Sequence, residues 1–144
     1  MNAPFVLLVD DEVPFVETMT KRLTKRKLKV ISAHSGPEAL EKMETSLDVV
    51  ILDVKMPGMD GIETLGEIKK DYPLVEVVML TGHATVETAI EGMKLGAYDY
   101  LMKPCDLEQL MSKVEAATRK KREHEEKIKD AQVKQNLSGK KGYW

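Results

Sequence analysis

Residues 48–61 read DVVILDVKMPGMDG, an apolar run closed by an acid and followed by a turn. The uninterrupted VVIL is typical of a strand that is buried on both faces of a parallel sheet. Asp53 ends this strand, and Pro57 and Gly58 then lead to a helix start near Gly61. Because α/β proteins keep their functional groups at the carboxyl edge of the sheet, Asp53 marks a candidate site.

Polar side chains end other apolar runs in the same way. Asp10 and Asp11 follow FVLLV, Thr81 follows VVML, and Lys103 follows the segment 98–102. Three carboxylates, a hydroxyl and an ammonium therefore stand at predicted strand ends. This set suits an aspartate that accepts a phosphoryl group with a divalent metal, because phosphoryl transfer depends mainly on positioning and charge neutralisation.

Strand patterns alternate with helical patterns five times. We predict strands at about 5–9, 29–33, 48–53, 75–80 and 97–102, and helices at about 14–27, 37–45, 61–71, 84–94 and from 107 onward. Five such units predict an α/β fold, a flavodoxin-like, doubly wound parallel sheet of five strands with helices on both faces. The strand order 2-1-3-4-5 fits, and its switch point lies between the strands that end in Asp10, Asp11 and Asp53.

Helix ends carry their own signals. Capping-box spacing occurs in three pairs, Ser35 with Glu38, Asp60 with Glu63, and Asp106 with Gln109. Gly96 lies just past the fourth helical pattern, where a left-handed cap is expected. The fifth pattern has apolar residues at 107, 110, 111, 114 and 117, so we expect this face to dock on the sheet.

The composition fits one domain with a tail. The 144 residues suffice for a core without staples. The single cysteine, Cys105, excludes an internal disulfide and fits a reducing compartment. The start lacks the basic region of a signal peptide, and no apolar run approaches the ~20 residues needed to span a bilayer. We therefore expect a soluble, cytoplasmic protein without membrane contact.

Charge divides the chain into two parts. Residues 1–118 hold 13 Lys and Arg against 20 Asp and Glu, whereas residues 119–144 hold 9 against 4. The acidic balance argues against direct nucleic-acid binding by the first part. We predict a domain over 1–118, and over 119–144 a charged helical extension with a loose C-terminal tail from Asn136.

The extension allows several interpretations. We rank a solvated helix first, a weak dimer strut or partner-binding arm second, and nucleic-acid binding third, because four acids interrupt its basic residues. A further alternative is that the chain is the front fragment of a longer regulator, with this extension as its linker.

Four pieces of the sequence together resemble the receiver domain of response regulators in two-component systems. They are Leu7–Glu12, Leu52–Gly61, Leu80–Ala84 and Gly96–Pro104, in this order and each at a strand end. The resemblance covers about residues 4–118. The stretch from Thr81 to Leu110 is most similar to receivers of the NtrC type, which stand in front of an ATPase and a DNA-binding domain.

The resemblance implies a phosphoprotein that works in signal transduction by phosphorelay. Asp53 would accept a phosphoryl group from a sensor histidine kinase in a Mg²⁺-dependent step. The resemblance implies that the domain would assist its own phosphorylation and dephosphorylation, so we expect a signalling domain and not an enzyme with a separate substrate.

The resemblance also implies a magnesium site. Asp11 and Asp53 would bind Mg²⁺ directly, Asp10 would act largely through water, and Lys55 would lend its backbone carbonyl. Adjacent carboxylates repel one another, so without a cation we expect at least one of their pKa values to rise. A small hard cation with oxygen ligands relieves this repulsion.

The remaining site residues receive their roles from the same resemblance. Lys103, with a cis bond to Pro104, would neutralise the phosphoryl group. Thr81 would form a hydrogen bond to it, and Tyr100 would follow as the switch aromatic. Lys55 and His83 would shape the access of water.

The switch would alter the face built from the fourth helix, fifth strand and fifth helix. That face would bind a downstream effector or output domain, or a second copy as a homodimer. One alternative is an aspartyl phosphatase of the haloacid dehalogenase type, whose Asp-x-Asp pattern is not matched by Asp10-Asp11-Glu12-Val13. Another is a phosphorylation-independent scaffold of the same fold.

Overall fold

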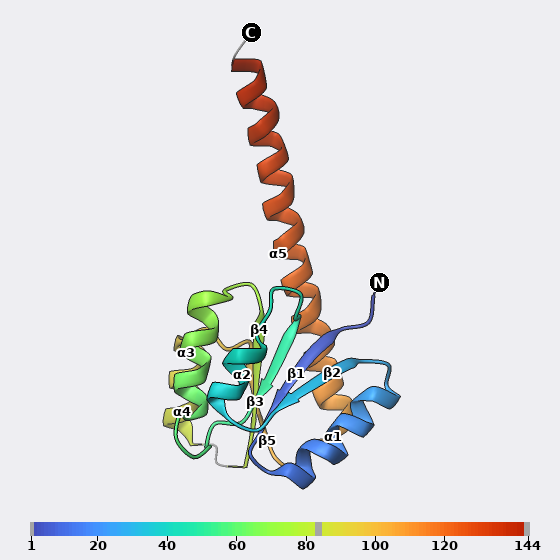
Figure 1. Ribbon diagram of the computed structural model, residues 1–144, viewed down its shortest axis with the longest axis vertical. Coiled ribbons are helices and arrows are strands. Elements are labelled where there is room, and N and C mark those ends of the chain that lie inside the picture. Colours follow the sequence, from blue (N-terminus) through green and yellow to red (C-terminus); the bar gives the residue numbers. More distant parts are fainter. Residues whose placement is uncertain (1, 83–84, 143–144) are drawn as a thin grey trace.

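The computed structural model describes residues 2–82 and 85–142, with side chains up to residue 138. Within these ranges strands and helices alternate: β1 (Phe5–Val9), α1 (Val13–Lys25), β2 (Lys29–Ala33), α2 (Gly36–Lys42), β3 (Val49–Leu52), α3 (Gly61–Asp71), β4 (Glu76–Thr81), α4 (Val86–Lys94), β5 (Asp99–Met102) and α5 (Leu107–Gly142). The strands form one parallel sheet in the order β2-β1-β3-β4-β5. The predicted class and strand order are confirmed (Figure 1).

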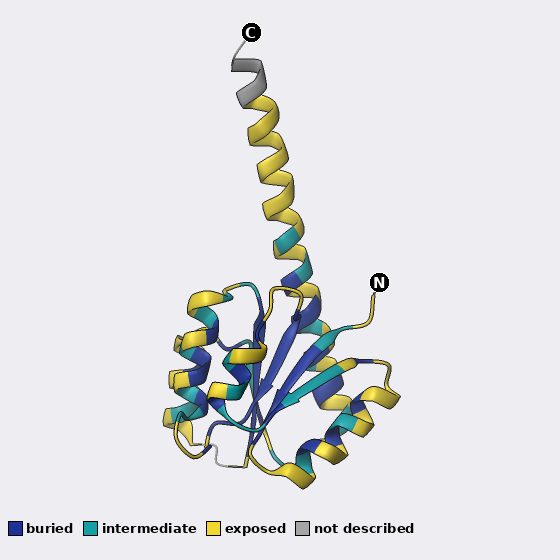
Figure 2. Cartoon of the chain, viewed as in Figure 1, coloured by how far each residue is buried: buried dark blue, intermediate teal, exposed yellow. Residues whose placement is uncertain are grey.

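The sheet is covered on both faces (Figures 1 and 2). Alternate strand residues point to opposite faces, so Leu7 and Val9 pack with α2 and α3, whereas Val6 and Leu8 pack with α1 and α5. The predicted docking face of α5 is confirmed by its buried residues, which are Leu110, Met111, Val114 and Ala117. Two apolar cores therefore fix the sheet between the helices.

The register of the sheet places the candidate site residues side by side. Val9 pairs with Leu52, so Asp10 and Asp53 follow neighbouring positions at the carboxyl edge. The amide of Asp53 donates to the carbonyl of Val9 at 3.0 Å. Further along the same carboxyl edge, between β4 and β5, the amide of Lys103 donates to the carbonyl of Thr81 at 2.8 Å.

The loop after β3 returns closely to the strand. The amide of Gly61 donates to the carbonyl of Val54 at 2.7 Å. A Cβ at this position would lie 2.0 Å from the carbonyl oxygen of Asp53, so a side chain there would displace the backbone of the candidate acceptor. Asp60 caps α3 by accepting from the amide of Glu63 at 2.8 Å, as its spacing predicts.

The structure refines several predicted helix ends. The Ser35 cap is present, and Gly96 adopts a φ of +104°, as expected for a left-handed cap. Asp106 caps the amide of Glu108 instead of Gln109. Helix α4 begins after Thr85, whose side chain and that of Thr88 form a capping box that the sequence analysis missed. Ser/Thr pairs give a weaker sequence signal for this box than Glu or Gln at the third position.

The end of the chain differs from the prediction. Helix α5 continues to Gly142, whereas the sequence pattern favoured a loose tail from Asn136. No proline interrupts residues 107–142, so the helix that starts at Leu107 can continue through Asn136, Ser138 and Gly139 although these are weak helix formers. The helix leaves the domain as an exposed rod (Figure 2).

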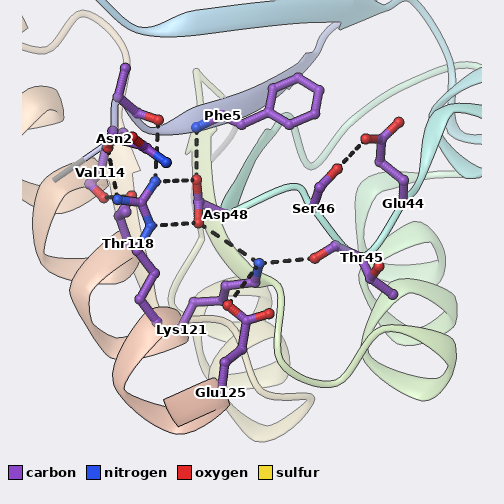
Figure 3. Close-up of polar contacts among 12 residues, drawn as sticks. Asn2, Phe5, Glu44, Thr45, Ser46, Asp48, Val114, Thr118, Lys121 and Glu125 are labelled. Atoms are coloured by element: carbon purple, nitrogen blue, oxygen red, sulfur yellow. Dashed lines mark hydrogen bonds and ion pairs between the residues drawn. The ribbon is translucent and has the colours of Figure 1, made fainter.

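A polar cluster anchors α5 where it leaves the domain (Figure 3). Arg122 donates to both carboxylate oxygens of Asp48, at 3.2 and 3.0 Å, and to the carbonyls of Asn2 and Ala3. Lys121, almost fully buried, donates to the carbonyl of Thr45 at 2.9 Å and lies 3.8 Å from Asp48. We call Asp48, Lys121 and Arg122 the basal clamp, since it lies at the amino ends of the strands.

None of the helices in the described part of the chain is long and apolar enough to cross a membrane.

Candidate functional site

Three acids gather at the carboxyl edge of β1 and β3. One carboxylate oxygen from each of Asp10, Asp11 and Asp53 lies within 4.8 Å of the others. Asp10 and Asp53 are 1% and 2% exposed, while Asp11 is open to solvent. An open cavity of about 400 Å³ is lined by Asp11 and Asp53 together with Lys55, and Asp10 lies beside it without lining it. The structure thus brings the four predicted metal-site residues to one place.

Each carboxylate oxygen of Asp10 accepts one hydrogen bond. Its Oδ1 accepts from the amide of Glu12 at 2.9 Å, and its Oδ2 accepts from Lys103 Nζ at 2.5 Å. Burial nevertheless raises the pKa of Asp10, and the nearby charge of Asp53 adds to the rise. The pKa of Asp10 is thus raised, as expected for one of the acids, but burial is the main cause and repulsion by Asp53 contributes less.

Lys103 reaches into the cluster from the end of β5. Its Nζ lies 3.5 Å from Glu12 Oε1 and 4.0 Å from Asp53 Oδ2, and it stands over the ring of Phe15 at 4.0 Å from the centroid. Burial would lower the pKa of Lys103, but the ion pairs with the three acids outweigh it and the pKa is raised. The Lys103–Pro104 peptide bond is cis, as the resemblance implied.

Of the two buried acids, Asp53 is satisfied less well than Asp10. Its Oδ1 is buried and accepts no hydrogen bond from the residues that the structure describes, and its Oδ2 lies at ion-pair distance from Lys103 but beyond hydrogen-bond reach. A buried carboxylate oxygen without a donor is costly. Such an oxygen is a position for a metal ligand or for a bond to a new group.

The two predicted switch residues lie on neighbouring strands. Thr81 is fully buried at the end of β4, and Met79 pairs with Tyr100 on β5. The hydroxyl of Tyr100 lies 3.1 Å from Thr88 Oγ1, so it is attached to the capping box of α4. His83, also singled out in the sequence, lies outside the described residues.

Three residues near the site were missed by the sequence analysis. Glu12 and Phe15 contact Lys103, and Thr88 contacts Tyr100. Glu12 could have been found from its place directly after the acidic pair. Phe15 and Thr88 gave no such signal, because each reads as an ordinary helix residue until the folded chain brings it to its partner.

The cluster fits a hard divalent cation. It offers carboxylate oxygens only, including the unsatisfied Oδ1 of Asp53, and the exposed Asp11 leaves room for retained water. A cation there would also stabilise the charged form of Asp10, whose pKa is raised mainly by burial and further by the charge of Asp53. The donor set therefore supports a metal site without identifying the metal.

Comparisons with known proteins agree with this geometry. Residues 6–115 match the family model of the response regulator receiver domain. The transcriptional regulatory protein ZraR of Escherichia coli (strain K12) is 42% identical over 113 residues, which are 78% of this chain and 26% of ZraR. The DNA-binding transcriptional regulator NtrC of Klebsiella pneumoniae is 33% identical over 118 residues, 81% of this chain and 25% of NtrC. The chain spans about a quarter of the length of these curated relatives.

Solved structures give the same result. The receiver domain of NtrX from Brucella abortus aligns with a TM-score of 0.74 and 33% identity, over 79% of this chain and 98% of that one. A response regulator receiver domain protein from Clostridium thermocellum aligns with a TM-score of 0.79 and 36% identity, over 83% and 97%. The chain belongs to the response regulator receiver family of two-component systems, and it is similar to receivers of the NtrC type.

Proposed function

We propose that this domain accepts a phosphoryl group on Asp53 from a sensor histidine kinase, in a Mg²⁺-dependent reaction in the cytoplasm. The observation that carries the proposal is Asp53 itself, a buried acid with one unsatisfied oxygen beside two further acids and an ammonium. Phosphoryl transfer requires a positioned nucleophile with positive charge close to it.

In this proposal, Asp11, Asp53 and the carbonyl of Lys55 hold the cation, and Asp10 assists through water. Bound Mg²⁺ would supply positive charge against the acids and the incoming phosphoryl oxygens. An oxygen of Asp53 forms a bond to phosphorus while the bond from phosphorus to the donor's histidine nitrogen breaks. The nitrogen keeps that electron pair.

Lys103 supplies the second positive charge. Its ammonium is already 4.0 Å from Asp53 Oδ2 and is paired more closely with Asp10. When a phosphoryl group adds negative charge at Asp53, the flexible lysine side chain can exchange part of its contact with Asp10 for a phosphoryl oxygen. Transfer thus redistributes charges that the folded domain has already gathered.

Output would pass through Thr81 and Tyr100. The hydroxyl of Thr81 would turn to the phosphoryl group, and Tyr100 would then leave Thr88 and follow. That movement would bias the face of α4 and β5, whose exposed apolar residues are Val86, Ile90, Met93, Leu95 and Met102. An apolar surface of this kind suits an output domain, a separate effector or a second copy.

The proposed roles of the two parts of the chain follow their charge balance. We propose residues 1–118 as the signal-receiving unit and residues 119–144 as an extension that would connect it to an output domain. The relatives are about four times as long as the matched segment, which favours the extension as a linker in a longer regulator.

The test is intact mass after incubation with acetyl phosphate and Mg²⁺, alongside Asp53→Asn. We expect a gain of one phosphoryl group in the wild type, loss of that gain with a chelator, and no gain in the variant. Persistent stoichiometric labelling of Asp53→Asn would exclude Asp53 as the acceptor.

Two other outcomes would favour the alternatives. A folded wild type that takes no label from acetyl phosphate or from a kinase, and does not bind the phosphoryl mimic beryllofluoride, would support the scaffold. Turnover of p-nitrophenyl phosphate would support the phosphatase, against the match to the receiver family over residues 6–115.

A further inference from the structure

Lys103 contacts one uncharged side chain in addition to three carboxylates. Its ammonium contacts Asp10, Glu12 and Asp53, and it also stands over the ring of Phe15, 4.0 Å from the centroid. The lysine side chain is 15% exposed. A cation over an aromatic face at this distance is attracted by the ring, and more strongly when water is excluded.

The core holds the Phe15 ring in place. Phe15 is the third residue of α1 and packs against the cluster that contains Val16, Met19 and Leu110. Helix α1 starts at Val13, with only Glu12 between it and the acidic pair, so its first turn lies beside the site. The ring is therefore fixed by apolar packing on one side and presents a face to the ammonium on the other.

Phosphorylation would change the charged partners of Lys103 but not this ring. A cation competes for Asp10 and Asp53, and a phosphoryl group at Asp53 draws the ammonium toward new oxygens. Phe15 binds neither the metal nor the phosphoryl group. This contact could therefore persist while the ion pairs exchange.

We propose that Phe15 is a positioning residue, whose ring keeps the Lys103 ammonium inside the site while its carboxylate partners change. The inference rests on the proposed function, because Lys103 must meet a phosphoryl group for its position to affect a rate. It adds a specific requirement, an aromatic face at position 15.

The chain contains a matched control for this contact. The other phenylalanine, Phe5, has Lys29 over its ring at 4.2 Å from the centroid. Lys29 is exposed and starts β2, at the sheet edge opposite the acid cluster. Weakening this second pair should leave phosphorylation unchanged.

The first experiment replaces Phe15 by 3,4,5-trifluorophenylalanine, which nearly keeps the ring's shape but removes most of its negative face. Phosphorylation is followed with Mg²⁺ across a range of acetyl phosphate concentrations. We expect the maximal rate to fall about 3- to 10-fold, as for loss of a partly desolvated cation–π contact, with little change in the half-saturating donor concentration. The same replacement at Phe5 should change neither value.

Substitutions of Phe15 by ordinary amino acids give a second test of the contact. Phe15→Leu keeps an apolar side chain without a ring and should show the same loss, whereas Phe15→Tyr keeps the ring and should restore the rate. A melting curve for each variant separates a lost contact from lost folding. A Phe15→Leu protein that fails to fold leaves the fluorinated variant, which is nearly isosteric, to decide.

A double-variant cycle tests whether Phe15 acts through Lys103. In a Lys103→Ala background, Phe15→Leu should cause no further loss of rate. A full loss in that background would overturn the inference, as would a wild-type rate in both the fluorinated and Leu variants. A wild type that takes no label at Asp53 would overturn the proposed function and this inference with it, while normal labelling with inert Phe15 variants would overturn the inference only.

Discussion

Strand β3 is flanked by a buried aspartate at each end, and the two have opposite surroundings. Asp48 accepts from the amide of Phe5 at 2.8 Å and from Arg122 at 3.0 and 3.2 Å. Asp53 has one oxygen without a donor in the described structure and the other 4.0 Å from Lys103. Both residues are 3% exposed or less, so burial does not distinguish them.

The difference extends to the charges around each acid. At the base, Lys121 and Arg122 come from α5 to meet Asp48, and the nearby buried Glu76 pairs with Lys69 and Lys120. At the carboxyl edge, Lys103 faces several acids, and burial raises the pKa of Asp10. A satisfied acid stabilises the fold, whereas an unsatisfied cluster retains the capacity to bind a cation or a new group.

The largest expected effect separates the two aspartates by function. Asp53→Asn should abolish phosphoryl acceptance, because the amide is not a nucleophile. The same change should leave the free energy of unfolding unchanged or raise it by about 1 kcal/mol without Mg²⁺, because it removes a poorly paired buried charge. Intact mass and urea denaturation measure the two quantities, and a marked loss of stability would contradict the comparison.

Asp48→Ala should lower stability and leave phosphoryl acceptance intact, which is the reverse of Asp53→Asn. It leaves Lys121 and Arg122 without their carboxylate, so we expect a loss of about 3 kcal/mol in the free energy of unfolding. The remaining folded protein should still accept a phosphoryl group on Asp53. Urea denaturation and labelling at a temperature well below the melting point test both parts. Unchanged stability would mean that the basal clamp is not a structural device.

The basal clamp should also direct the helix that leaves the domain. Lys121→Met removes the donor to Thr45 and the ion pair with Glu125, so we expect a loss of about 1–2 kcal/mol. Distances between spin labels on α1 and on residue 134 should then broaden. Lys127→Met, at an exposed position of the same helix, is the control and should change stability by less than about 0.5 kcal/mol.

Magnesium should stabilise the carboxyl edge and leave the base unaffected. At a concentration ten times the dissociation constant, binding adds about 1.4 kcal/mol to the free energy of unfolding. We expect the melting temperature of the wild type to rise with Mg²⁺ and that of Asp11→Asn to rise much less. An equal rise in both proteins would remove Asp11 from the metal site.

The smallest expected effect is a pH dependence from Asp10. Because burial raises the pKa of Asp10 in the folded chain, the metal-free folded state binds this proton at a higher pH than the unfolded chain does. Asp10 therefore lowers stability as pH rises from its ordinary pKa through the raised value.

Asp10→Asn isolates this contribution from those of other acids. Without metal, it should be more stable than the wild type above the raised pKa, and the difference should shrink as pH falls. Urea denaturation from acidic to neutral pH measures it. A difference that grows as pH falls would contradict the raised pKa.

Much of the site could be predicted because it stands at strand ends. Apolar runs set the strands, and the residues that follow them were Asp10, Asp11, Asp53, Thr81 and Lys103. A parallel sheet brings such residues to one edge whatever the details of packing. The capping box of α4 and the helical end of α5 were missed, because their local signals are weak and their outcome depends on hydrogen bonds along the folded chain.

The α/β architecture and the acidic edge could be read from the chain alone, since they follow from periodicity and from residues next to one another, and the strand order was the common one that fits five βα units. Which charges are satisfied became visible only in the folded structure. Arg122 meets Asp48 across 74 positions, and Lys103 meets Asp10 across 93. No local pattern encodes such pairs, because they form only when the packed cores hold distant elements together. The two aspartates beside one strand became different for that reason.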